Sequence, residues 1–368
     1  MERIRQLYLL GQSIWYDDLD RALVRSGRLA ELAQAGGVYG VTTNPSIFQK
    51  ALSQSDRYAD AIARWQRQGV RSPRALYEHL VVEDVRAACD ALRPLYERTH
   101  GQDGFVSLEV DPHLAYDADA TLAEAQRLWS WVDRPNLLIK IPATAPGLRA
   151  IEDAIAAGVP VNVTLLFSVA RYRAVVDAYL RGLERRAARG LSLDVPSVAS
   201  FFVSRIDTKV DAALKPLLAR SDARGQQARE LLGTIAVANA RQAYQAFKAM
   251  FATERFARLA AQGARVQRLL WASTSTKNPA YPDTKYVDEL IGPNTVNTVP
   301  PHTWQAFVDH GTPRLTLEQD PVGDAMRLVL LQDLGIDLDA ITQALEEEGV
   351  RAFVDAFDRL LAALAAVS

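Results

Sequence analysis

The stretch Leu137-Leu138-Ile139-Lys140-Ile141-Pro142 places one lysine inside an otherwise apolar run. Aliphatic runs of this length are typical of a buried strand in a parallel sheet. Lysine is almost never fully buried without a partner or a chemical task. Because desolvation favours a neutral amine, a buried lysine can serve as a nucleophile that forms a Schiff base with a ketone. The alternative is a lysine at a strand end whose stem reaches solvent.

Short runs of this kind alternate with longer stretches of helical periodicity along the whole chain. Such alternation is typical of a parallel α/β fold, and about eight strands are needed to close a TIM barrel. We therefore predict an α/β fold, a (β/α)8 TIM barrel with an additional C-terminal helix, built as a single domain over residues 1–368. The expected strands are residues 13–17, 38–42, 105–110, 137–141, 159–164, 197–203, 268–273 and 295–299.

The helical stretches lie between these strands. The clearest are residues 116–131, 225–250 and 168–186, and Ser168 is expected to cap the last of these at its N-terminus. Residues 341–366 carry apolar side chains at helical spacing, which predicts an extra helix packed across the barrel. No linker rich in proline and glycine divides the chain.

Composition excludes several classes of function. The chain has 368 residues, 49% of them hydrophobic, and a net charge of -2, which gives no sign of a basic nucleic-acid-binding surface. No apolar run approaches the length of a membrane span, and the N-terminus lacks a secretory pattern, so we expect a cytoplasmic protein. The single cysteine, Cys89, lies in an expected helix interior and is interpreted as structural.

Polar residues gather where the expected strands end, which is the face on which TIM barrels assemble their active sites. They are Asp17, Thr42, Glu109, Lys140, Thr164, Arg205 and Ser273. The five histidines show no metal-ligand spacing, and no glycine-rich phosphate or dinucleotide loop follows a strand. These observations predict chemistry without a metal or a cofactor.

Asn136 to Thr144, NLLIKIPAT, resembles the Schiff-base lysine strand of transaldolases. Further stretches match the same family, in order along the chain, and they cover nearly all of it. They are residues 16–20 (YDDLD), 40–46 (GVTTNPS), 106–111 (VSLEVD), 161–168 (VNVTLLFS) and 200–205 (SFFVSR). The segment WASTSTKNPAY at 271–281 and the extended C-terminal helical region look closest to the longer bacterial subfamily.

The resemblance implies a catalytic set. Lys140 would form the Schiff base, and its iminium would act as the electron sink for carbon-carbon cleavage. Asp17 would be the general acid/base, although Asp18 is an alternative for this role. Glu109 and Thr164 would move protons through a bound water during Schiff-base formation. An ion pair between Glu109 and Lys140 is a structural account of the same residues, and it is compatible with catalysis.

The resemblance also implies a substrate-binding set. Arg205 and Ser273 would hold the substrate phosphate, for which a planar guanidinium is suited. Where shorter transaldolases carry a second arginine, this chain has Ser-Thr-Ser at 273–275, so Lys277 is the first candidate for the second cation and Lys285 is the reserve. The dihydroxyacetone moiety would be bound or walled by Thr42, Asn44, Asn162, Ser200 and Phe202. Taken alone, Asn44 before Pro45 could equally be a turn residue.

These expectations together predict transfer of a dihydroxyacetone unit from sedoheptulose 7-phosphate to glyceraldehyde 3-phosphate, in the non-oxidative branch of the pentose phosphate pathway. Expected partners are sugar phosphates, with neither nucleic acid nor membrane, and a homodimer is allowed. One rival is an aldolase of the same family that releases free dihydroxyacetone. The other is a sugar-phosphate-binding barrel without turnover.

Overall fold

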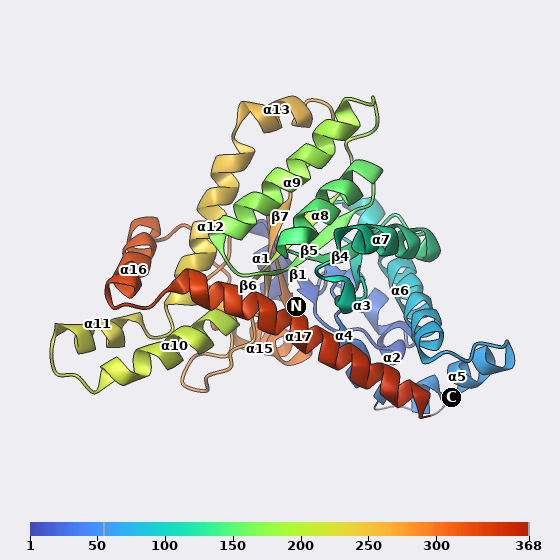
Figure 1. Cartoon of the computed structure of the whole chain (residues 1–368), viewed down its shortest axis with the longest axis horizontal. Coiled ribbons are helices and arrows are strands. Elements are labelled where there is room, and N and C mark those ends of the chain that lie inside the picture. The colour runs from blue at the N-terminus through green and yellow to red at the C-terminus, as the bar shows by residue number, and fades with distance from the viewer. Residues whose placement is uncertain (54–55, 367–368) are drawn as a thin grey trace.

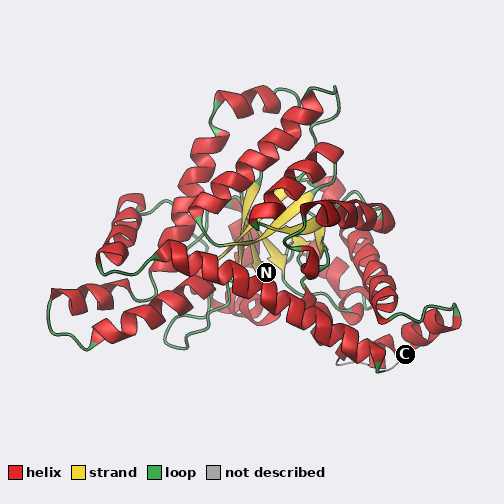
Figure 2. Cartoon of the chain, in the orientation of Figure 1, coloured by secondary structure: helices red, strands yellow, loops and turns green. Residues whose placement is uncertain are grey.

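A computed structural model describes residues 1–53 and 56–366 of the chain. Eight parallel strands lie side by side in chain order, and the last pairs with the first, so the sheet closes into a barrel. Figure 2 shows these strands at the centre of a ring of helices. The strands are β1 (Gln12–Tyr16), β2 (Gly40–Val41), β3 (Phe105–Glu109), β4 (Leu137–Pro142), β5 (Val161–Leu166), β6 (Ser197–Phe202), β7 (Arg268–Ala272) and β8 (Thr295–Val299). The predicted TIM barrel is confirmed.

The strands are buried along almost their whole length, because helices cover the outside and side chains fill the inside. β2 is much shorter than the expected 38–42. Its Gly40 lies against the indole of Trp15, where a Cβ would come within 2.6 Å of the Trp15 Cδ2 atom. Only glycine therefore fits at this point of the barrel.

The helices follow the strands around the barrel (Figure 1). They are α1 (Glu2–Leu9), α2 (Arg21–Arg25), α3 (Arg28–Gln34), α4 (Pro45–Ser53), α5 (Ala59–Arg67), α6 (Pro73–Arg98), α7 (Ala118–Val132), α8 (Ala145–Ala157), α9 (Val169–Ala187), α10 (Ser204–Leu218), α11 (Ala223–Leu231), α12 (Ile235–Phe251), α13 (Glu254–Ala260), α14 (Lys285–Asp288), α15 (Pro301–His310), α16 (Pro321–Asp333) and α17 (Leu338–Ala365). Two short 3-10 helices, η1 (Asp56–Tyr58) and η2 (Pro112–Leu114), complete the set for the described residues.

Sequence patterns located most of the helices that they addressed. Ser168 caps α9 as expected, because its side chain accepts a hydrogen bond from the amide of Arg171. The single helix predicted over 225–250 was wrong, since α11 ends at Leu231 and α12 begins at Ile235. Gly233 adopts a φ of +65°, and its amide donates to Asp211 at 2.9 Å, which turns the chain between the two helices.

The N-terminal end of the barrel is held by one buried carboxylate. Asp103 accepts hydrogen bonds from Ser13 at 2.8 Å, from the Trp15 indole at 3.0 Å and from Arg268 at 3.1 Å. These contacts link β1, the segment before β3, and β7. This end of a TIM barrel serves stability, which leaves the opposite end for chemistry.

The C-terminal end of the barrel is crossed by α17, the long red helix at the front of Figure 1. Its buried face contacts α4, α6, α10 and β5. The predicted extra helix is therefore present, and it begins at Leu338 rather than at 341. Among the described helices, none is both long enough and apolar enough to cross a lipid bilayer.

Candidate functional site

A cavity of about 220 Å³ opens at the C-terminal ends of the strands. Most of the residues predicted from sequence meet in it, although they come from distant parts of the chain. Those that line it are Asp17, Thr42, Asn44, Lys140, Ser200, Phe202, Arg205, Ser273 and Lys277. Glu109, Asn162 and Thr164 do not line this cavity and are buried within the barrel.

Lys140 stands near the centre of β4 with only 4% of its surface exposed. Strand register places it between Glu109 on β3 and Asn162 on β5. Its Nζ donates to the carbonyl of Thr43 at 3.0 Å and lies 3.7 Å from the Glu109 Oε2 atom. The second distance is that of an ion pair without a hydrogen bond. The buried strand predicted at 137–141 is thus present, with an amine that reaches the cavity.

Glu109 carries a carboxyl group with a strongly raised pKa. Burial raises its pKa to about 7, and the charge of Lys140 opposes that rise. Within the described residues, neither carboxylate oxygen of Glu109 has a hydrogen-bond partner, and the same holds for the hydroxyl of Thr164. Buried polar groups are normally paired, so these atoms retain capacity to bind a water or a reacting group. A carboxyl group with a pKa near neutrality can exchange protons in both directions.

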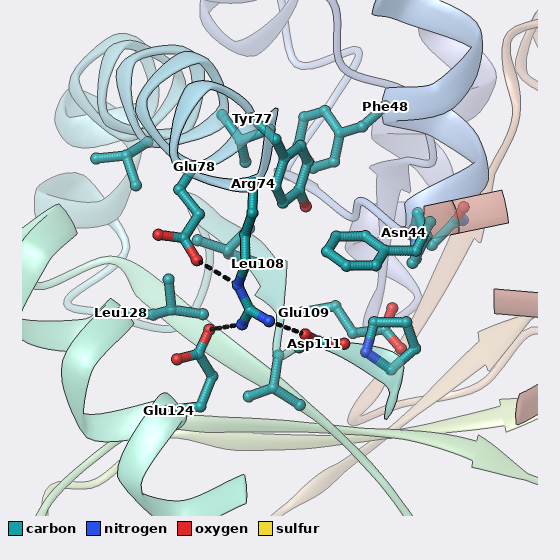
Figure 3. Close-up of a pocket in the computed structure, with 16 residues that line it drawn as sticks. Asn44, Phe48, Arg74, Tyr77, Glu78, Leu108, Glu109, Asp111, Glu124 and Leu128 are labelled. Carbon is teal, nitrogen blue, oxygen red and sulfur yellow. Dashed lines mark hydrogen bonds and ion pairs between the residues drawn. The ribbon is translucent and has the colours of Figure 1, made fainter. Parts of the chain in front are cut away.

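A small closed cavity of about 20 Å³ lies between Glu109 and α6 (Figure 3). It has room for roughly one water molecule. Beside it, Arg74 is ion-paired to Asp111 at 2.7 Å and to Glu78 at 3.2 Å. Asp111 lies two residues after β3, so its pair with Arg74 ties the end of the strand that carries Glu109 to α6.

Asp17 follows β1 and points into the mouth. The Thr42 hydroxyl donates to its Oδ1 atom at 2.6 Å. Burial raises the pKa of Asp17, while Lys140, the Thr42 bond, Lys277 and Arg205 oppose the rise. Asp18 does not line the cavity, and Asp20 is the N-cap of α2. The geometry therefore favours Asp17 over Asp18 as the acid/base.

A chain of hydrogen bonds crosses the barrel below the mouth. Ser200 donates to Asn162 at 2.6 Å, and Asn162 donates to Ser107 at 2.9 Å. Asn44 lines the cavity and also accepts from the amide of Ile47 at 3.1 Å at the start of α4. Its binding role and its turn role are thus both compatible with the structure.

Two cations face the outer part of the cavity. Arg205 stacks over Phe202, with 5.4 Å from its guanidinium carbon to the ring centroid, and Lys277 donates to Ser275 at 2.6 Å. Burial lowers the pKa of both groups, and the charge of Arg205 lowers that of Lys277 further. In the described chain, neither makes an ion pair closer than 4.0 Å. A phosphate bound between them would supply the missing negative charge.

The reserve cation is placed elsewhere. Lys285 does not line the cavity, and its Nζ pairs with Glu289 at 2.6 Å along α14. Lys277 is therefore the better candidate for the second cation.

Several residues that line the cavity were not assigned to the site by the sequence analysis, and Phe353 and His302 are two of them. Phe353 on α17 lies with its ring centroid 5.9 Å from Lys140 Nζ, and His302 comes from the start of α15. In the sequence, Phe353 looks like one more apolar residue of an amphipathic helix, because periodicity does not say which surface a helix covers. His302 belongs to no motif that would have distinguished it.

Fold and site together define a TIM-barrel protein in which the C-terminal half of the barrel holds a buried amine, two carboxyl groups with raised pKa and two neighbouring cations. Its sequence matches the family model described as Transaldolase/Fructose-6-phosphate aldolase over residues 14–364. The chain belongs to this family.

Its relatives are similar over nearly their whole length. A transaldolase of Thiobacillus denitrificans is 51% identical, with 96% of this chain and 97% of that protein covered. A transaldolase of Acidothermus cellulolyticus is 50% identical, with 98% and 95% covered. A transaldolase of Neisseria gonorrhoeae is 48% identical, with 96% and 97% covered.

Proposed function

We propose that the chain is a transaldolase that moves a dihydroxyacetone unit from sedoheptulose 7-phosphate to glyceraldehyde 3-phosphate through a Schiff base on Lys140. The observation that carries this proposal is the setting of Lys140, a buried amine 3.7 Å from a carboxyl group whose pKa is about 7. The reaction belongs to the non-oxidative branch of the pentose phosphate pathway. Membership of the family and the named relatives support the assignment.

The proposed steps use the chain's own groups. Lys140 Nζ adds to the substrate ketone, and Glu109 with Thr164 moves the protons that convert the adduct into an iminium and a water. Asp17 takes the proton of the adjacent hydroxyl group as the carbon-carbon bond breaks, and the iminium accepts the electron pair. The aldehyde leaves, and the resulting enamine attacks the acceptor aldehyde while Asp17 returns the proton. Water then hydrolyses the new iminium, which releases the ketose product and restores the Lys140 amine.

Binding is assigned to two groups of residues. We place the phosphate between Arg205 and Lys277, with Ser273 beside them at the end of β7. The hydroxyl groups of the three-carbon unit would meet the polar side chains deeper in the mouth, and the Phe202 ring would form a wall. The deeper residues are Thr42, Asn44, Asn162 and Ser200.

Reduction with borohydride in the presence of fructose 6-phosphate tests the chemistry directly. The expected result is a stable mass increase on the peptide that contains Lys140. Lys140→Arg should abolish both the mass increase and turnover, because arginine keeps its proton at physiological pH. A Lys140→Arg variant with a tenth of the parent activity would assign the nucleophile to another residue.

Two measurements separate the rivals, the release of free dihydroxyacetone and the borohydride trapping. Release of free dihydroxyacetone without an acceptor would indicate the aldolase of the same family. An unmodified parent protein would indicate a sugar-phosphate-binding barrel without turnover.

We further propose that residues 1–368 act as one domain in the cytoplasm and that the chain forms a homodimer. Return of α17 onto β5 supports the single domain, since the last helix completes the mouth of the barrel.

The dimer would use an apolar stripe on α16 in which Val322, Met326 and Val329 are 74%, 62% and 52% exposed. Light scattering should give twice the chain mass, and Met326→Glu should return it to the monomer value.

A further inference from the structure

Leu165 has an unusual backbone conformation for its residue type. Its φ is +56° although it lies inside β5 and is fully buried. This left-handed region is sterically unfavourable for an L-residue, and for a bulky residue it is a genuine outlier. Of the other described non-glycine residues with positive φ, Ser273 directly follows β7, and His100, Asp133 and Asn294 occupy turns or a helix end. Leu165 has no such local reason for its conformation.

The unusual residue marks a bulge next to Thr164. The pairing of β5 with β6 is regular up to Val163 and shifts before Leu166, so Thr164 and Leu165 occupy the irregular part of the strand. Bulges next to active sites re-aim side chains. Here the shift falls on Thr164, whose buried hydroxyl has no partner within the described chain.

The side chain of Leu165 meets α17 at Gly349. A Cβ on Gly349 would lie 2.7 Å from the Leu165 Cδ2 atom, closer than real Cβ contacts allow. Glycine inside a helix is less favourable than alanine, so α17 carries a locally unfavourable residue at this contact. The contact thus brings together two locally unfavourable residues, Leu165 with its positive φ in β5 and the glycine inside α17.

Phe353 follows Gly349 by four residues and therefore lies on the same face of α17. Its ring is one wall of the cavity that contains Lys140. The contact between Leu165 and Gly349 consequently ties the strand that carries Thr164 to the helix that carries Phe353.

We propose that Leu165 and Gly349 are positioning residues. The Leu165 side chain on β5 packs against Gly349 on α17, and this contact holds Thr164 and Phe353 in place beside Lys140. This inference rests on the proposed function, because it assigns Thr164 a part in Schiff-base formation. Strain of this kind persists where the surrounding structure enforces it, and it clusters at sites where side-chain placement matters. A strained leucine packed on a helix glycine is such an arrangement.

The test is Gly349→Ala, measured by the rate at which fructose 6-phosphate becomes trapped on Lys140 by borohydride. We expect the trapping rate and kcat to fall about 10- to 100-fold, the range for a misplacement near 1 Å, while KM stays within about twofold. Phosphate binding would be retained because Arg205 and Lys277 are not on β5 or α17. The melting temperature should change little, since better helix propensity offsets the displaced leucine.

A second variant shortens the Leu165 side chain instead of adding a methyl group at Gly349. Leu165→Ala should also slow trapping, and Leu165→Ala combined with Gly349→Ala should trap faster than Gly349→Ala alone, because the alanine methyl then has room. The matched control is Gly292→Ala before β8, where a Cβ would likewise meet the side chain of a buried leucine, at 2.8 Å from the Leu317 Cδ2 atom. It should trap at the parent rate.

Parent-like trapping by Gly349→Ala would overturn the inference, and so would a double variant slower than Gly349→Ala. If Gly349→Ala does not fold, parent-like trapping by Leu165→Ala would overturn it instead. A parent protein that is not trapped on Lys140 would overturn the proposed function, whereas a trapped parent with an unaffected Gly349→Ala variant would overturn this inference alone.

Discussion

Replacement of Asp17 by asparagine should separate Schiff-base formation from carbon-carbon cleavage. The asparagine side chain keeps an oxygen that can accept the 2.6 Å hydrogen bond now donated by Thr42, so the local geometry is retained. It cannot accept the proton of the substrate hydroxyl. Loss of a general acid/base lowers rates by about 10²- to 10⁴-fold, which corresponds to roughly 3–5 kcal/mol in the barrier to cleavage. Asp17→Asn should therefore lose turnover yet still be trapped on Lys140 by borohydride.

The pH dependence follows from the raised pKa of Asp17. As a base, Asp17 is active when ionised, so cleavage in the parent should rise with pH through a pKa above the ordinary 3.8. The pH–rate profile of Asp17→Asn should lack this rise. For stability the sign is opposite, because a carboxyl group whose pKa is raised on folding favours the folded state most at low pH and loses that contribution as pH rises through its folded-state pKa. At neutral pH, Asp17→Asn should therefore melt no lower than the parent.

Asp18→Asn provides the matched control, since Asp18 is adjacent in sequence but does not line the cavity. Single-turnover release of erythrose 4-phosphate from sedoheptulose 7-phosphate measures cleavage, and mass analysis of the trapped peptide measures Schiff-base formation. Parent-like cleavage in Asp17→Asn, or the same defect in Asp18→Asn alone, would refute the assignment. Loss of trapping together with cleavage would place Asp17 in the earlier step.

Other predictions concern the remaining charged groups. Glu109→Gln should remove an acid limb near pH 7 from the rate of Schiff-base formation, measured by trapping across pH, and a persisting limb would assign it to another group. Arg205→Ala should raise KM far more for phosphorylated than for unphosphorylated sugars, and Lys277→Ala should do so more weakly; equal losses for both substrates would remove them from the phosphate site. Activity should survive exhaustive chelation, because the iminium is the electron sink, and loss with EDTA that a divalent ion restores would contradict the mechanism. Asp103→Ala should cost about 3–5 kcal/mol in denaturant unfolding, since it leaves Arg268 without its buried partner.

The barrel was predictable because short runs rich in β-branched, aliphatic and aromatic residues alternate with helical stretches along the chain, and the number of such runs then limits the architecture. Individual boundaries were less predictable. The break at Gly233 was missed because a glycine inside a helical pattern is tolerated as often as it ends a helix. The close contact of Gly40 in β2 with Trp15 was not predictable either, because no local pattern records it.

The residues of the site likewise differ in how far the sequence could predict them. In a parallel barrel, a position at the end of a strand is also a position at the mouth, so residues such as Asp17 and Ser273 could be placed together before their distances were known. Phe353 could not, because an amphipathic helix discloses a buried face without disclosing what that face covers. The role of Gly349 could not be predicted from the sequence either, where it is only an unfavourable residue in a long helix. Its meaning depends on Leu165, and that pair joins two residues far apart in the chain. The reactive residues on the strands could thus be predicted from local sequence patterns. The placement of α17 over them could not, because it depends on a contact that forms only in the folded structure.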